Sequence, residues 1–321
     1  GWERSPVELI GEEGACYGRG TMDNKAGVAA MVATILRLRA EGREPRRELV
    51  FAFVADEETG MLTTEAIAAH AWVKDAEFAI NTDAGGGLLD DRTGKPLIYL
   101  VQGAEKTYAT FDLVVRNRGG HSSRPRADNA IYQLMHALGK VEAYRFPVMS
   151  NALARSYLDE VGKTQEGEVG AILRRFAANP DDAAAADALA QSPEFVGTTR
   201  TTCVATMLEA GHAENALPQT AKAAGNCRIF PGVEVETVRE ALAAAIADPQ
   251  VKITTRDAPK ASPVSEMRPD VMRAIGNAVH AVYPDLPISP REVEDFLNRT
   301  MGSTSQQAML GYVFKDTGGF L

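Results

Sequence analysis

The stretch Leu49-Val-Phe-Ala-Phe-Val-Ala-Asp-Glu-Glu58 decides the fold, because a short, β-prone apolar run ends in three consecutive acids. A second apolar run covers residues 78–82 and is followed directly by Asp83. Between the two runs, residues 63–71 have a pattern typical of a helix. The order strand, helix, strand favours a parallel sheet, in which the acids after both strands lie at the same edge.

A glycine-rich turn adds a third acid to that edge. The turn Tyr17-Gly-Arg-Gly20 precedes Asp23, and the apolar side chains of residues 24–41 then recur at helical spacing. Carboxylates crowded on one rim repel one another unless a cation neutralises them, and zinc, cobalt and manganese accept carboxylate oxygen as a ligand. The simplest interpretation is a divalent metal site. The alternative is that Asp56-Glu57-Glu58 is a solvated surface turn.

The middle of the chain predicts a separate, antiparallel α+β unit. Strands are expected within residues 96–116 and at 201–209, 222–230 and 251–255, with helices at 129–144 and 235–248. A polar excursion near residues 150–198 contains an alanine-rich helix at 179–191, and we expect it to be a helical insertion. Residues 258–264 have linker composition. We therefore expect a first domain in two parts, residues 1–107 and 258–321, interrupted by a second domain at residues 108–257.

The composition fits a folded protein of about two domains. The 321 residues are 45% hydrophobic, which is more core-forming material than a disordered chain contains. The 43 acidic and 34 basic residues give a net charge of -9, which argues against a nucleic-acid surface. No apolar run approaches the roughly 20 residues that span a membrane, so we expect a soluble protein. Cys16, Cys203 and Cys227 form no CxxC pair, and we expect small buried side chains rather than a disulfide or a zinc site.

Five motifs, taken in order, resemble those of one known family. They are Tyr17-Gly-Arg-Gly-Thr-Met-Asp-Asn-Lys-Ala-Gly27, Ala55-Asp-Glu-Glu-Thr-Gly60, Asn81-Thr-Asp-Ala-Gly-Gly86, Gly119-Gly-His-Ser-Ser-Arg-Pro125 and Asn215-Ala-Leu-Pro218. Over nearly the whole chain they resemble the zinc metallopeptidase family of aminoacylase, glutamate carboxypeptidase, succinyl-diaminopimelate desuccinylase and carnosinase-type dipeptidases. The resemblance implies an α/β, zinc-peptidase-like three-layer catalytic domain. It also implies an inserted α+β lid domain that forms a homodimer.

The resemblance assigns roles to the acids of the first domain. Asp23 would bridge two divalent metal ions, and Glu58 and Asp83 would each bind one of them. Zinc is expected, with cobalt or manganese as alternatives. Glu57 would be the general base that takes a proton from water and returns it to the leaving amine.

The resemblance also assigns roles to residues of the lid domain. His121, with two glycines before it and two serines after it, matches a histidine that reaches a partner's active site and helps to hold the oxyanion. The alternative is a loop histidine that caps a turn. Asn215 and Arg228 match positions that contact substrate, where the arginine would offer its guanidinium fork to a carboxylate.

Two parts of the family pattern do not occur in this sequence. The family has a His-x-Asp segment upstream of the first motif and a second metal histidine near the carboxyl end. His70, His136, His212 and His280 do not lie in these contexts, and we interpret them as surface or core histidines. Gly302-Ser-Thr-Ser305 resembles a Gly-x-Thr-Asp stretch with serine in place of aspartate. We therefore expect a piece of a longer protein, truncated at both ends and inactive by itself.

The leading hypothesis is a dinuclear zinc hydrolase, which is a carboxypeptidase, dipeptidase or deacylase. It would cleave an amide or peptide bond next to a free carboxylate in small peptides or N-acyl amino acids. The rival is a non-catalytic homodimeric binding protein on the same scaffold, motivated by the missing histidines and by Ser305. A phosphate-loop hydrolase is discarded because no Gly-Lys-Ser/Thr follows Gly27. The sequence leaves side-chain preference open and favours the cytoplasm over secretion, although an upstream signal would not be visible.

Overall fold

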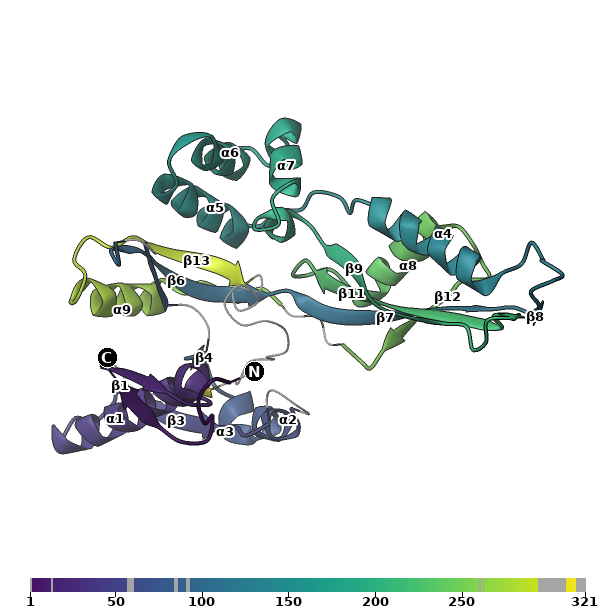
Figure 1. Cartoon of the computed structure of the whole chain (residues 1–321). Coiled ribbons are helices and arrows are strands. Elements are labelled where there is room, and N and C mark those ends of the chain that lie inside the picture. Colours follow the sequence, from purple (N-terminus) through teal and green to yellow (C-terminus); the bar gives the residue numbers. More distant parts are fainter. Residues whose placement is uncertain are drawn as a thin grey trace. The chain divides into compact units, whose positions relative to one another are not determined.

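The computed structural model describes residues 2–12, 14–56, 61–83, 86–90, 93–259, 261, 263–293 and 310–315. The chain divides into two compact units, Gly1–Gly85 with Asp295–Leu321 and Gly86–Glu294. Helices and sheets alternate in the first unit, and an antiparallel sheet with its own helices dominates the second (Figure 1). The fold class is therefore α/β with an inserted α+β domain, as the sequence predicts.

The first unit is built around the sheet β3-β14-β4. Because β14 runs antiparallel to both neighbours, β3 and β4 run in the same direction, but they do not pair with each other. The two predicted helices, at residues 24–41 and 63–71, and both predicted strands are confirmed within a few residues. The elements are β1 (Ile10–Glu12), β2 (Ala15–Tyr17), α1 (Ala26–Ala40), β3 (Glu48–Phe53), α2 (Leu62–Ala69), α3 (Ala71–Lys74), β4 (Phe78–Asn81) and β14 (Leu310–Lys315).

The second unit contains two larger sheets, β12-β7-β11-β9 and β13-β6-β5. The first of them is called the lid sheet below. The elements are β5 (Gly86–Leu89), β6 (Pro96–Glu105), β7 (Thr107–Arg116), β8 (Gly120–His121), α4 (Ala130–Ala143), α5 (Ala152–Thr164), α6 (Gly167–Ala178), α7 (Ala183–Ala190), β9 (Thr202–Ala210), β10 (Ala216–Leu217), β11 (Thr220–Ile229), α8 (Val235–Ile246), β12 (Lys252–Arg256), α9 (Pro269–His280) and β13 (Ile288–Val293).

The lid sheet is antiparallel throughout, and α4 and α8 cover one of its faces (Figure 1). Alternate residues of β7 and β11, such as Phe111 and Ile229, point to this face and are fully buried against Leu134 of α4 and Leu242 of α8. The opposite face carries charged side chains, as expected for an antiparallel sheet with one solvated side. There Arg256 of β12 pairs with Asp112 of β7 at 2.5 Å.

The helical insertion contains more helices than the sequence predicts. The predicted alanine-rich helix is α7, and α5 and α6 precede it where we expected only a polar excursion. The three helices enclose a core of their own, in which Leu158, Leu173 and Phe176 are fully buried. The signal was present in the sequence, because Leu153, Leu158 and Val161 are apolar residues at roughly helical spacing on α5.

The expectation for the cysteines was wrong. Cys203 of β9 and Cys227 of β11 form a disulfide, and Cys16 is exposed rather than buried. Spacing alone could not reveal the pair, because the two residues are 24 positions apart and become neighbours only through the register of the lid sheet. Only Cys227 is fully buried, as expected.

The domain boundaries at residues 107/108 and 257/258 stay a prediction. The two compact units divide the chain elsewhere, and α9 and β13 belong to the same unit as the lid sheet. Within the part of the chain that the structure describes, no helix is long and apolar enough to cross a membrane.

Candidate functional site

Asp23 lies in an irregular turn that joins the glycine-rich segment to α1. Thr21 closes the turn by donating its hydroxyl proton to the carbonyl oxygen of Gly18 at 2.9 Å, and the Lys25 N–H donates to Gly20 O at 2.8 Å. The backbone of Asp23 and Asn24 is not helical, and the peptide bond between them is cis. Helix α1 therefore begins only after the turn has presented the Asp23 carboxylate.

A contact between Asn24 and Thr82 joins the Asp23 turn to the end of β4. The Asn24 side chain donates to Thr82 Oγ1 at 3.4 Å and accepts from the Gly27 N–H at 2.9 Å, so it also caps α1. Gly27 allows this approach, since a Cβ there would lie only 2.4 Å from Thr82 Oγ1. Asp83 follows Thr82 and is positioned by its N–H donating to Asn81 Oδ1 at 2.8 Å. The structure thus brings the segments that carry Asp23 and Asp83 together, as the sequence predicts.

The Asp23 carboxylate has an unusual environment. Its Oδ1 atom is buried and accepts no hydrogen bond. A buried carboxylate oxygen without a donor is costly unless a positive group satisfies it. An oxygen left free in this way suits coordination to a hard or borderline divalent cation. The residue therefore fits the metal-binding role that the family resemblance implies.

Glu57 and Glu58 lie outside the described residues, and their roles stay predictions. Asp56, which precedes them, is not part of the rim: its carboxylate accepts from the Leu62 N–H at 2.7 Å and from the N–H and hydroxyl of Thr63. These donors, the Thr63 hydroxyl foremost, lower the pKa of Asp56. Asp56 therefore caps α2, and the Met61 N–H donates to Asp56 O at 2.9 Å.

His121 and Asn215 lie together at the free end of the lid sheet. His121 in β8 pairs with Ala216 in β10, and the Ser122 N–H donates to Asn215 O at 2.9 Å. His121 Nδ1 accepts from the Ser123 N–H at 3.2 Å, so the neutral ring carries its proton on Nε2. The exposed His121 ring therefore offers an N–H donor to an external group. Nδ1 of His121 caps the turn, and Nε2 is the nitrogen that the functional role would use, so the two roles are compatible.

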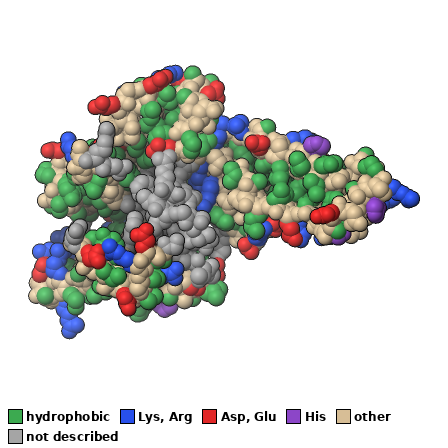
Figure 2. Space-filling view, viewed as in Figure 1, with side chains coloured by type: hydrophobic (Ala, Val, Ile, Leu, Met, Phe, Trp, Pro, Cys, Tyr) green, Lys and Arg blue, Asp and Glu red, His purple; other side chains and the backbone are tan. Residues whose placement is uncertain are grey.

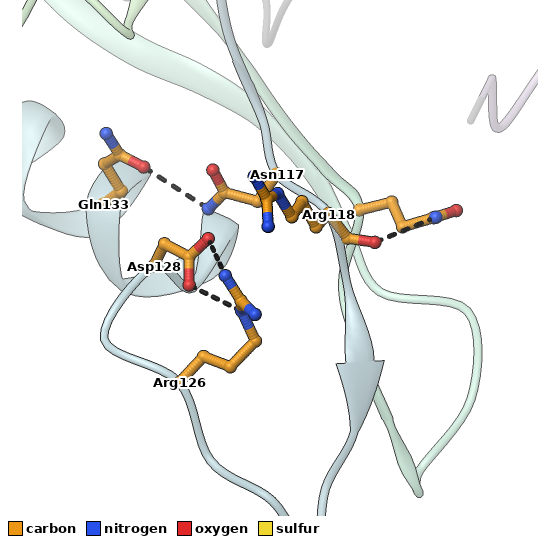
Figure 3. Close-up of polar contacts among 6 residues, drawn as sticks. Asn117, Arg118, Arg126, Asp128 and Gln133 are labelled. Atoms are coloured by element: carbon orange, nitrogen blue, oxygen red, sulfur yellow. Dashed lines mark hydrogen bonds and ion pairs between the residues drawn. The ribbon is translucent and has the colours of Figure 1, made fainter.

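Polar contacts hold the segment that carries His121. Figure 3 shows the Arg126 guanidinium pairing with both oxygens of Asp128, at 2.7 and 2.8 Å, and Asn117 Nδ2 donating to Gln133 at 3.4 Å. The guanidinium of Arg126 lowers the pKa of Asp128. Figure 2 shows Lys or Arg and His side chains at this end of the lid, among hydrophobic and acidic ones. The segment that carries His121 is therefore held by polar contacts before and after it.

Arg228 lies at the opposite end of β11 from His121 and Asn215. It pairs in register with Tyr108, and its guanidinium lies over the Tyr108 ring with 4.7 Å to the ring centroid. Thr220, at the other end of the strand, is eight residue steps of about 3.4 Å away, or roughly 27 Å. One copy of the chain therefore does not place Arg228 and His121 on the same small substrate.

The described residues hold no group of three or more His, Cys, Asp or Glu side chains that could bind a metal ion. Sequence reasoning missed the supporting contacts of Asn24, Thr82 and Ser123. All three residues belong to the quoted motifs, and their position beside a proposed functional residue was the signal that could have revealed them. Their hydrogen-bond partners depend on the fold, which the motifs do not specify.

Comparisons with known proteins point to metallopeptidases. The family model of the peptidase dimerisation domain matches residues 103–254, and that of peptidase family M28 matches residues 7–122. The N-fatty-acyl-amino acid synthase/hydrolase PM20D1 of Homo sapiens is 29% identical over 299 residues, 90% of this chain and 58% of the relative. The probable carboxypeptidase S-like 2 of Dictyostelium discoideum is 27% identical, over 90% of this chain and 56% of the relative. These matches support an M20-family metallopeptidase.

A solved structure supports the fold of the chain. The dipeptidase Dug1p from Saccharomyces cerevisiae superposes with a TM-score of 0.53 over 91% of this chain and 64% of that one, at 17% identity. The chain spans about three fifths of the length of the curated relatives named above.

Proposed function

We propose that the protein that contains this chain is a metal-dependent hydrolase. Its substrates would be small peptides or N-acyl amino acids, in which it cleaves the amide bond next to a free carboxylate. The observation that carries the proposal is the buried Asp23 oxygen without a hydrogen-bond donor, held beside the segment of Asp83 by the Asn24–Thr82 contact. The similarity to M20 peptidases and hydrolases supports the same chemistry.

The first unit would supply the metal ligands and the base. Asp23 would hold two divalent ions, and Asp83 and Glu58 one each, with zinc as the expected metal and cobalt or manganese as alternatives. When bound, the ions supply Lewis-acid polarisation of the scissile carbonyl. Glu57 would accept a proton from the attacking water and deliver it to the leaving amine nitrogen.

The lid would bind the substrate and the developing negative charge. His121 Nε2–H is available as a donor to the oxyanion, because Nδ1 is occupied by the Ser123 N–H. Asn215 lies beside it and would contact the substrate amide. Arg228 would pair with the substrate carboxylate through its guanidinium fork.

The separation of these residues favours a homodimer through the lid. Since roughly 27 Å of β11 divides Arg228 from the end that bears His121, one site would take Arg228 from one copy and His121 from its partner. A surface for pairing exists at β9, the edge strand of the lid sheet, next to α4. Five apolar side chains around this edge, each 57–65% exposed, are together called the edge patch: Tyr132, Met135 and Leu208 on the side of α4, and Val204 and Met207 on the other face of β9. The match to a peptidase dimerisation domain covers both elements.

The test is a specificity measurement on the full-length gene product. Hydrolysis of an N-acyl amino acid is compared with that of the same compound with its carboxylate converted to an amide. A hydrogen bond to a charged group contributes about 1.5–3 kcal/mol, so we expect roughly a 10- to 150-fold preference for the free acid. Arg228→Gln should abolish the preference, and Arg239→Gln, at a surface arginine of α8 that pairs with Glu236, should not.

Metal analysis of the same protein separates the hydrolase from its rival. About two zinc equivalents with turnover, both lost in Asp23→Ala, support the hydrolase. A dimer with neither metal nor turnover supports the non-catalytic binding protein.

A further inference from the structure

The disulfide joins the edge strand of the lid sheet to the strand beside it. Cys203 on β9 and Cys227 on β11 are directly opposite in the antiparallel register, with their Cα atoms 4.1 Å apart. This spacing is nearer to a non-hydrogen-bonded pair, about 4.5 Å, than to a hydrogen-bonded pair, about 5.5 Å. Both side chains point to the face covered by α4 and α8, where Cys227 is part of the core and Cys203 packs against it.

A β-bulge lies three residues beyond Cys203 on β9. Gly225 pairs with Ala205 and Ala224 pairs with Met207, so Thr206 is an extra residue in the edge strand. Residues 204–210 of β9 are all exposed, and they carry three members of the edge patch. A slip by one residue would turn Met207 toward the core and Leu208 away from it, because side chains alternate between the two faces.

We propose that the Cys203–Cys227 disulfide fixes the register of β9 and that its reduction weakens the pairing of two copies through the edge patch. The second part rests on the homodimer of the proposed function. The bond forms when the two thiols lose two protons and two electrons to a disulfide oxidant, which is reduced to two thiols in exchange. In the reverse reaction, a dithiol reductant attacks Cys203 Sγ, because Cys203 is half-buried while Cys227 is fully buried.

The bond opposes local opening of the edge strand. It closes a loop of 24 residue positions within the lid. A cross-link of this length restricts the open states of β9 far more than the closed one. The other edge strand, β12, pairs with β7 and has no such link, so it is an internal control.

The first experiment needs no assumption about the dimer. Thiol counting on the unfolded, non-reduced chain should find one thiol, that of Cys16, and three thiols would overturn the proposal. Hydrogen exchange is then compared before and after treatment with a phosphine reductant. Amides of β9 should exchange on the order of a hundredfold faster after reduction, while those of β12 should not change. Equal exchange of β9 in both states would overturn the proposed role in fixing the register.

The second experiment measures self-association by analytical ultracentrifugation. The oxidised chain should form a dimer whose dissociation constant rises about tenfold or more on reduction, and Cys203→Ser should behave like the reduced chain in either state. Cys16→Ser is the control and should still respond to reductant. A dimer that ignores reduction overturns the inference and leaves the proposed homodimer intact. A monomer in both states overturns both.

Discussion

Gly27→Ala tests whether the metal-binding turn depends on the close approach of α1 to the end of β4. The new Cβ would lie 2.4 Å from Thr82 Oγ1 and 2.6 Å from Asn24 Oδ1. Ordinary van der Waals contact begins at 3.4 Å, so the Asn24 and Thr82 segments must move apart by about 1 Å. The movement would break both the Asn24–Thr82 contact and the Asn24 cap on the Gly27 N–H.

The expected loss follows from these contacts. Overpacking costs about 1–3 kcal/mol and loss of the cap about 1 kcal/mol, while replacing glycine in a helix gains up to about 1 kcal/mol. We therefore expect the free energy of unfolding to fall by about 1–3 kcal/mol. Zinc affinity of the full-length gene product should fall on the order of tenfold or more, because the residues that orient Asp23 and Asp83 are displaced.

Urea denaturation monitored by circular dichroism measures the first quantity, and calorimetric zinc titration the second. Gly139→Ala is the matched control, since Gly139 lies within α4 and nothing lies within 4 Å of the added Cβ. It should stabilise the chain by about 0.5–1 kcal/mol through helix propensity alone. If Gly27→Ala also stabilises the chain and leaves zinc affinity unchanged, the close approach does not organise the site.

Two other predictions concern stability. Asn129 Oδ1 accepts from the N–H groups of Ile131 and Tyr132 and so caps α4. Asn129→Ala should therefore lower the free energy of unfolding, measured by urea titration, by about 0.5–2 kcal/mol, whereas Asn129→Ser should retain most of the stability. Equal losses in the two variants would argue against the cap. The Arg268 guanidinium lowers the pKa of Asp270 to about 2, so this carboxylate stabilises the fold above its ordinary pKa of 3.8 and loses that contribution as pH falls toward 2. Asp270→Asn should therefore lower the melting temperature at pH 6 and not at pH 2, and a difference that persists at pH 2 would contradict this.

The local elements of the fold could be predicted because their patterns are local. Helix α1 has an apolar stripe, and β3 and β4 are short apolar runs bounded by polar residues. The sequence could not predict that β14 lies between β3 and β4, because Leu310–Lys315 pairs with strands more than 220 residues away. The Cys203–Cys227 pair could not be predicted for the same reason, because it depends on the register of β9 against its neighbouring strand.

The candidate site was predictable as a set of motifs and not as a geometry. The motifs indicated that Asp23 and Asp83 lie at one edge, and the Asn24–Thr82 contact shows how their segments meet. Asp56 was grouped with its two neighbours, but two N–H groups and a hydroxyl at the start of α2 occupy its carboxylate. Its role depends on where α2 begins, which periodicity alone does not define. The assignments of Glu57 and Glu58 stay predictions.

The most direct test of the proposed hydrolase is Glu57→Gln in the full-length gene product, with metal content and turnover measured on the same sample. Glutamine keeps the shape of glutamate but cannot accept the proton. If Glu57 is a general base and not a metal ligand, the variant should lose turnover and keep its metal. We predict wild-type metal content and a fall in turnover of about 100-fold or more. Loss of metal together with turnover would make Glu57 a ligand, and retained turnover would remove it from catalysis; either result contradicts the assignment.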